Sequence, residues 1–172
     1  MAKKVQIFNN FLDQEVFLEI KKFIMSPRCQ WRYVSYIAHK DGRDNDNDGY
    51  FVHSFKDCHP QTFEDRYPES PHFPLIAKIL DKIKYQNILR IRSSLYPRRD
   101  VQKPDPFHVD YNFPHRVCIF YVNTNNGYTM FENGEKIPSV ENQLATFDGS
   151  EKHCSVVQTD TSARYIVNIN IL

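Results

Sequence analysis

The chain has 172 residues, enough for one domain with a sizeable core. It carries 22 Lys and Arg against 21 Asp and Glu, so no strong overall field attracts it to nucleic acid or to an anionic membrane. With 41% hydrophobic residues and only 5 Gly, the composition is that of a globular protein and excludes a disordered one.

The first half of the chain predicts two helices with little regular structure between them. A short strand and then a helix are expected over 5–25, and a strand-like pattern follows over 31–38. A polar, acidic loop at 41–49 and a stretch rich in Pro and charge at 56–74 come next. The second helix is expected over 75–85, where apolar residues recur at helical spacing.

From residue 87 onward, short strand-like runs alternate with turn residues. Eight strands are predicted, at 88–96, 107–110, 117–122, 128–131, 137–140, 143–147, 154–158 and 163–171. Asn125–Gly127 and Glu132–Glu135 are predicted hairpin turns. This pattern predicts a mainly β fold, a sandwich or jelly-roll core with N-terminal helices on one sheet. We expect a single domain over 1–172, with a helical support and lid region at 1–86 and the jelly-roll core at 87–172.

The most informative motif is His108-Val-Asp110 followed by a lone His153. Residues i and i+2 of a strand point the same way, so His108 and Asp110 are predicted to face one side. Two imidazoles and one carboxylate can bind one face of Fe(II) and leave other positions open. Zn(II) fits the same ligands, with water in the fourth place. Arg164, in the last predicted strand, adds a fork for a carboxylate and favours the iron interpretation.

These residues resemble the Fe(II)/2-oxoglutarate-dependent dioxygenase superfamily, most of all its prolyl-4-hydroxylase-like branch, and are similar to small phage-encoded oxygenases. In this resemblance His108, Asp110 and His153 match the iron ligands and therefore the catalytic residues. Arg164 matches the basic residue that binds the distal carboxylate of 2-oxoglutarate. Tyr96, in Ser-Leu-Tyr-Pro, matches a tyrosine that also reaches this carboxylate.

Two further positions concern the cosubstrate. Thr129, in Gly-Tyr-Thr-Met-Phe, matches the threonine of the family's G-x-T-x-F stretch. Many relatives have R-x-S where this chain has Arg164-Tyr-Ile166, so the serine hydroxyl is lost or replaced. Asn168, on the same strand face, is the candidate replacement.

The resemblance implies a double-stranded β-helix, a jelly-roll or cupin-like core with N-terminal helices. It implies Fe(II), with 2-oxoglutarate and O₂ as cosubstrates, and hydroxylation of a C–H bond with release of succinate and CO₂. A peptidyl proline is the first expected substrate, while a free amino acid, another small metabolite and an alkylated nucleobase stay open. The alternative from another class is a non-catalytic jelly-roll module that binds a metal or a ligand.

Partners and location follow from what the sequence contains. We expect a protein, peptide or small-molecule substrate, and neither a membrane nor a nucleic-acid partner. No apolar run approaches the roughly 18 residues of a membrane span, and no signal peptide is evident. The expected location is the cytoplasm, that of the host if the chain is phage-encoded. The sequence does not predict an oligomeric state.

Three remaining features have competing interpretations. Asp44–Gly49 mimics the start of an EF-hand loop, but Phe55 stands where a bidentate Glu is required, so a solvated loop or lid is expected. Some aromatic residues before the core are candidate substrate contacts or, more commonly, core residues: Trp31, Tyr33, Tyr36 and Tyr50. A basic stretch predicts solvated surface, with an acidic peptide or nucleic-acid substrate as the alternative: Arg90, Arg92, Arg98, Arg99 and Lys103.

Overall fold

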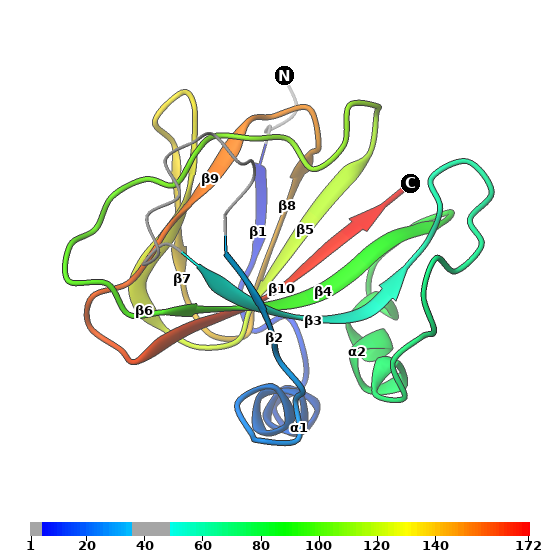
Figure 1. Cartoon of the computed structure of the whole chain (residues 1–172), viewed down its shortest axis with the longest axis horizontal. Helices are drawn as coiled ribbons and strands as arrows, with labels where there is room; N and C mark the ends of the chain where they lie inside the picture. The colour runs from blue at the N-terminus through cyan, green and yellow to red at the C-terminus, as the bar shows by residue number, and fades with distance from the viewer. Residues whose placement is uncertain (1–4, 36–48) are drawn as a thin grey trace.

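The structure, a computed structural model, describes residues 5–35 and 49–172 (Figure 1). Residues 44–48, with the EF-hand-like pattern, and Tyr36 lie outside the described residues. The helices are α1 (Gln14–Ile24) and α2 (Phe73–Leu80). The strands are β1 (Val5–Phe8), β2 (Arg32–Val34), β3 (Tyr50–Asp57), β4 (Ile88–Pro97), β5 (Arg116–Tyr121), β6 (Asn125–Phe131), β7 (Lys136–Ser139), β8 (Gln143–Asp148), β9 (His153–Val156) and β10 (Ala163–Ile171). No helix among the described residues is long and apolar enough to span a membrane.

The described strands form two antiparallel sheets. The larger sheet has seven strands in the order β1-β8-β5-β10-β4-β3-β2, and the smaller has three in the order β7-β6-β9. Figure 1 shows the smaller sheet beside the larger one, with both helices beyond the larger sheet on its other side. The fold is therefore mainly β with a jelly-roll-like core, as the alternating strands and turns predicted.

Alternation along the central strands divides the core into two clusters. On β5, Cys118 and Phe120 pack in the cluster that contains the helices, whereas Ile119 and Tyr121 pack in the cluster between the sheets. Successive side chains of a strand point to opposite faces, so one strand serves both clusters. Because the helices cover only one face of the larger sheet, its other face is left to form a cavity against the smaller sheet.

The structure corrects one predicted turn and one predicted strand, and it adds a strand. The strand predicted at 107–110 does not form: His108 makes only an isolated bridge to His153. Asn125–Gly127 lie at the start of β6 and not in a hairpin turn, because the chain crosses from the larger to the smaller sheet just before them. The predicted turn at Glu132–Glu135 is confirmed between β6 and β7, with Gly134 at a φ of 87°. The strand β3 was not predicted, and it lies next to β4 in the larger sheet.

Candidate functional site

A cavity of about 330 Å³ lies between the two sheets. Strand β4 lines it with alternate residues that share one face: Arg90, Arg92, Ser94 and Tyr96. Strand β10 contributes in the same way: Arg164, Ile166 and Asn168. In the pairing register Tyr96 lies opposite Arg164, and Arg92 lies opposite Asn168. The second pair is four residues away from the first on each strand. The cavity therefore has two ends, which we call the carboxylate end (around Arg164) and the metal end (around Asp110, beside Asn168).

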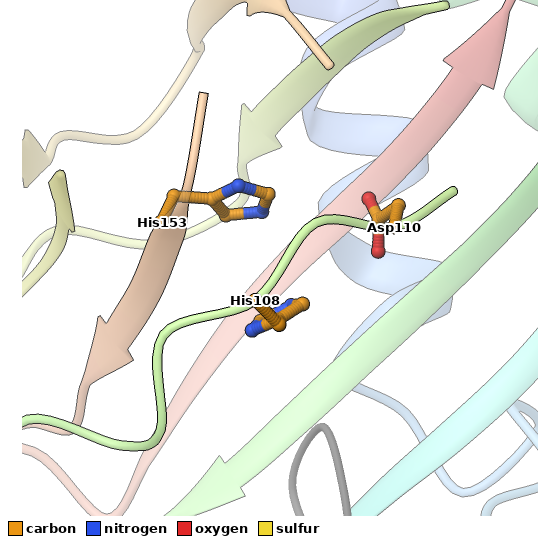
Figure 2. Close-up of side chains that lie close together, drawn as sticks. All are labelled: His108, Asp110 and His153. Carbon is orange, nitrogen blue, oxygen red and sulfur yellow. The ribbon is translucent and has the colours of Figure 1, made fainter. Parts of the chain in front are cut away.

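His108, Asp110 and His153 come together at the metal end. Their ligand atoms all lie within 4.8 Å of one another. His153 begins β9, whereas His108 and Asp110 lie in an extended segment beside it (Figure 2). The backbone N–H of each histidine donates to the carbonyl of the other at 3.0 Å. This two-bond bridge, and not membership of one regular strand, holds the two imidazoles next to each other.

Both imidazoles are oriented by backbone carbonyls. His108 Nδ1 lies 3.2 Å from the Pro106 oxygen, and His153 Nδ1 lies 3.1 Å from the Glu151 oxygen. A carbonyl accepts only from a protonated Nδ1, so this arrangement leaves each Nε2 lone pair available to a metal. Burial and then the neighbouring His153 lower the pKa of His108 to about 4. At neutral pH His108 is therefore in the form that binds metals.

Hydrogen bonds to both carboxylate oxygens hold Asp110 in place. Arg90 Nη2 donates to Oδ1 at 2.9 Å, and Asn168 Nδ2 donates to Oδ2 at 3.3 Å. Burial by itself would raise the pKa of Asp110, but Arg90 and the other cationic neighbours outweigh it and hold this pKa well below its ordinary value. Asp110 is thus ionised and oriented, as a metal ligand needs to be.

Arg164 dominates the carboxylate end and is 0% exposed. It donates from Nε to Ser139 Oγ at 2.7 Å, from Nη1 to Ser155 Oγ at 2.7 Å and from Nη2 to Thr129 Oγ1 at 3.3 Å. All three acceptors are neutral hydroxyls, and no carboxylate of a described residue forms an ion pair with Arg164. A Cβ at Gly127 would lie 2.9 Å from Arg164 Cδ, so the glycine makes room for this side chain.

Aromatic rings enclose the Arg164 guanidinium. Its central carbon lies 5.5 Å from the Tyr96 ring centre and 5.7 Å from that of Tyr121. The hydroxyls of Tyr121 and Thr129 share a hydrogen bond of 2.9 Å, and Tyr50 stacks on Tyr96 with ring centres 5.2 Å apart. Burial and the neighbouring Tyr50 raise the pKa of Tyr96 to about 12. The Tyr96 hydroxyl therefore stays protonated and can donate a hydrogen bond to an anion.

The predicted site residues fall into two groups. The structure brings the predicted metal ligands together at the metal end, and it places Tyr96 and Thr129 around Arg164 at the carboxylate end. Asn168 was predicted to substitute for a contact near Arg164, but its amide donates to Asp110. Among the aromatic candidates, Tyr50 lines the cavity.

Sequence reasoning missed several residues that line the cavity or contact Arg164 and its neighbours. Ser139, Ser155 and Tyr121 were not predicted, and Arg90 and Arg92 were expected at the solvated surface although they line the cavity. A signal existed for three of these residues. Arg90 and Arg92 share strand parity with Tyr96, and Ser155 shares it with His153, so each faces the same side as a predicted site residue.

No protein-family model matches the sequence, and no curated protein is similar to it in sequence. Solved structures do resemble its fold. An oxidoreductase of the 2OG-Fe(II) oxygenase family from Burkholderia pseudomallei has a TM-score of 0.67 and 10% identity, over 98% of this chain and 85% of that one. A prolyl hydroxylase from Trichoplax adhaerens, in complex with a peptide fragment of the hypoxia inducible factor oxygen degradation domain, has a TM-score of 0.62 and 12% identity, over 99% and 84%.

A third similar structure is that of an enzyme of a different kind. The non-heme α-ketoglutarate-dependent epimerase SnoN from nogalamycin biosynthesis has a TM-score of 0.63 and 10% identity, over 98% of this chain and 77% of that one. At such low identities the comparison concerns the fold, and one fold hosts many reactions. The chain has the fold of the 2-oxoglutarate/Fe(II) oxygenases, prolyl hydroxylases among them.

Proposed function

We propose that this protein is a 2-oxoglutarate- and O₂-dependent Fe(II) dioxygenase that hydroxylates a C–H bond. The observation that carries the proposal is the presence, in one cavity, of a three-ligand metal group and a fully buried arginine that forms no ion pair with a described acidic residue. Neither feature alone is specific. Together they match an enzyme that holds a metal and a dicarboxylic acid side by side.

The metal group fits Fe(II). Two imidazoles whose Nδ1 atoms face backbone carbonyls and one ionised carboxylate make the set that non-heme Fe(II) oxygenases use, and this set leaves positions open for other ligands. His108, Asp110 and His153 would hold the ion. Arg90 and Asn168 would keep the Asp110 carboxylate in its orientation.

The carboxylate end fits the distal carboxylate of 2-oxoglutarate. A buried guanidinium surrounded by neutral hydroxyls is costly to bury without an anion, and a carboxylate offsets that cost. Thr129 and Tyr96 add hydroxyl groups to this pocket. Ile166 removes the serine hydroxyl of the family pattern, but Ser94 lies opposite it in the register and lines the same cavity. We assign the replacement contact to Ser94.

The chemistry of the reaction comes largely from the cofactor. When bound, Fe(II) and 2-oxoglutarate activate O₂ so that one oxygen atom enters the substrate C–H bond and the other enters succinate, with release of CO₂. The side chains of the cavity bind and orient: Arg164 fixes the cosubstrate, and the strands β4 and β10 hold the two ends at a set separation. No side chain is required as a general acid or base.

The first substrate to test is a peptidyl proline, because prolyl hydroxylases are among the similar structures and one of them holds a peptide. A small metabolite is the second class, since the similar epimerase SnoN comes from nogalamycin biosynthesis. An alkylated nucleobase and a non-catalytic binding module are the remaining options. Formation of succinate from 2-oxoglutarate separates an enzyme from a binding module.

The test is an anaerobic titration of the apo-protein with Fe(II) and then 2-oxoglutarate, followed by visible absorption. We expect a weak charge-transfer band that is absent in His153→Ala, and succinate after O₂ is admitted. If the protein retains iron but shows no band, the assignment of Arg164 to the carboxylate of 2-oxoglutarate is wrong. A band without succinate would favour the binding module.

A further inference from the structure

The wall of the cavity carries more positive charge than the proposed cofactors use. Arg32 on β2 and Arg90 and Arg92 on β4 line the same cavity as Arg164. Among the described residues, Asp110 is the one acidic side chain that lines it. Asp110 is already paired with Arg90 at 2.9 Å. The Arg32 and Arg92 guanidinium groups therefore form no ion pair with a described acidic residue, and Asp110, the carboxylate that acts most strongly on Arg92, is bound by Arg90.

Arg92 is the more confined of these two groups. Its side chain is half-buried, its Nε is shielded from solvent, and no described residue accepts a hydrogen bond from that atom. It lies opposite Asn168, whose amide contacts Asp110, so it stands beside the metal group. A cation next to a divalent-metal site is repelled by the metal, and an unpaired buried N–H is costly. An anion that binds Arg92 in the loaded cavity would offset both costs.

The distal carboxylate of 2-oxoglutarate is not this anion. Arg164 lies opposite Tyr96, and four residues of β4 separate Tyr96 from Arg92, about 13 Å along the strand. Arg164 is also surrounded by Ser139 and Ser155 from the smaller sheet. A cosubstrate bound between Arg164 and the metal would fill the carboxylate end and leave the Arg92 guanidinium facing the space for the substrate.

We infer that the substrate carries a carboxylate that Arg92 binds while the target C–H lies beside the metal group. This inference rests on the proposed oxygenase function and specifies its substrate class. The planar guanidinium matches a carboxylate in a two-bond contact, and the exposed Arg32 extends the positive surface toward the solvent. The cavity is at the small end for ligand pockets and is shared with the cosubstrate. The substrate is therefore a small carboxylic acid, such as a free amino acid, or a peptide that inserts an acidic group.

The experiment compares each acid with its own amide. Wild-type protein is loaded anaerobically with Fe(II) and saturating 2-oxoglutarate, and the charge-transfer band is followed during titration with matched pairs. The pairs are the free amino acids and their amides, prolyl peptides with Glu or Gln beside the proline, and the same peptides with free or amidated C-termini. We expect at least one acid to shift the band at a concentration at least tenfold below that of its amide.

Variants assign the effect to Arg92. Arg92→Met keeps the length of the side chain without its charge, and we expect it to weaken the binding of that acid at least tenfold while the affinity for 2-oxoglutarate stays unchanged. Arg98→Met is the matched control, because Arg98 is exposed and does not line the cavity. If Arg92→Met does not fold, Arg92→Lys keeps the charge but loses the planar fork and should bind the acid with intermediate affinity. The acid and amide pairs in wild-type protein are independent of both variants.

The outcomes separate the two proposals. A band shift by free amino acids points to a small acid, and a shift by acidic peptides alone points to a peptide substrate. The inference is overturned if no acid shifts the band, if amides act equally, or if acids abolish the band by displacing 2-oxoglutarate. It is also overturned if Arg92→Met loses affinity for 2-oxoglutarate, because Arg92 would then hold the cosubstrate. Absence of the band before any acid is added would instead contradict the oxygenase proposal.

Discussion

The two ends of the cavity differ in the sign and in the partners of their buried charged side chain. At the carboxylate end, the cation Arg164 is completely buried among hydroxyls and aromatic rings, with no described carboxylate beside it. At the metal end, the anion Asp110 is already balanced by Arg90 and oriented by Asn168. One end is centred on a cation bound by neutral hydroxyls, and the other on an anion bound by Arg90 beside two imidazoles.

This difference shows how one small cavity can bind two unlike groups in a fixed relation. Each end is ordered by contacts within the protein before anything binds, so little ordering is left for the moment of binding. Charge then contributes to specificity: Arg164 attracts the distal carboxylate of the cosubstrate and repels a metal ion, whereas Asp110 and the two imidazoles supply the donor atoms that a metal ion needs. The variants below remove one end at a time.

The largest effect is expected from His153→Ala. This change removes one of three ligands and also the backbone-anchored ring beside His108, so we expect no measurable turnover and a loss of Fe(II) affinity of more than about 100-fold. Isothermal titration with Fe(II) under argon measures the loss. His59→Ala is the control, because His59 is exposed and does not line the cavity. Wild-type turnover in His153→Ala would remove the metal end from the site.

The next largest effect is expected from Arg164→Met. Removal of one partner of a buried charge pair costs about 3–5 kcal/mol, which corresponds to a loss of 2-oxoglutarate affinity of roughly 100-fold or more. Fe(II) affinity should stay within about twofold, because Arg164 does not contact the metal group.

The same variant has a second readout in the apo-protein. Because Arg164 is buried without an anion, its replacement by an apolar side chain should leave the free energy of unfolding within about 1 kcal/mol of wild type. Urea denaturation measures this value. A large loss of stability with unchanged cosubstrate affinity would mean that Arg164 serves the fold and not the ligand.

The sequence was informative where motif spacing and strand parity concern the site, although His108 and Asp110 lie outside any regular strand. His108 and Asp110 were predicted to share a side, and a far histidine and an arginine on the last strand completed the set. Parity also placed Arg90 and Arg92 on one face, but parity alone does not say whether that face looks into a cavity or into solvent. Tyr96, a predicted cosubstrate contact on the same face of β4, indicated that this face looks into the cavity.

Other contacts could not be predicted because they depend on tertiary distance. Ser139 meets Arg164 only because β7 of the smaller sheet faces β10 of the larger one. The strand β3 was missed because it follows a charged loop and a register shift between Ser54 and Lys56 interrupts its pairing, although Tyr50 and Val52 alternate as a strand should. The helices and the turn at Glu132–Glu135 depend on local patterns and were easier to predict than these contacts.

A smaller effect is expected from Gly127→Ala. The new Cβ would lie 2.8 Å from Asn125 Oδ1, 2.9 Å from Arg164 Cδ and 3.0 Å from the Val156 carbonyl oxygen, so these neighbours, the Arg164 side chain among them, have to shift. Overpacking of this kind costs about 1–3 kcal/mol, and we expect a loss of 2-oxoglutarate affinity of about tenfold with Fe(II) affinity unchanged.

Gly134→Asn is the matched control for this variant. Gly134 has a φ of 87° in the β6–β7 turn, with no atom near its missing Cβ, and Asn tolerates this backbone conformation. The control should bind 2-oxoglutarate as wild type does. Equal losses in both variants would show that Gly127 acts through the stability of β6 and not through Arg164.

The smallest effect is expected from Asn168→Ala, and it decides between two assignments. Asn168 accepts a hydrogen bond from Asn170 and donates one to Asp110 at 3.3 Å, so it belongs to the metal end. Loss of a single neutral contact to a ligand carboxylate should lower Fe(II) affinity by about tenfold or less. The affinity for 2-oxoglutarate should not change, because four residues of β10, about 13 Å, separate Asn168 from Arg164.

The opposite pattern would restore the sequence-based assignment of Asn168. If Asn168→Ala weakens 2-oxoglutarate while Fe(II) affinity is unchanged, Asn168 supplies the contact that Ile166 has lost. Ser94→Ala is then the decisive companion, because Ser94 lies opposite Ile166 and is the residue to which we assign that contact. A loss of 2-oxoglutarate affinity in Ser94→Ala and not in Asn168→Ala would place the replacement on β4, across the strand pair from the position at which the family pattern has its serine.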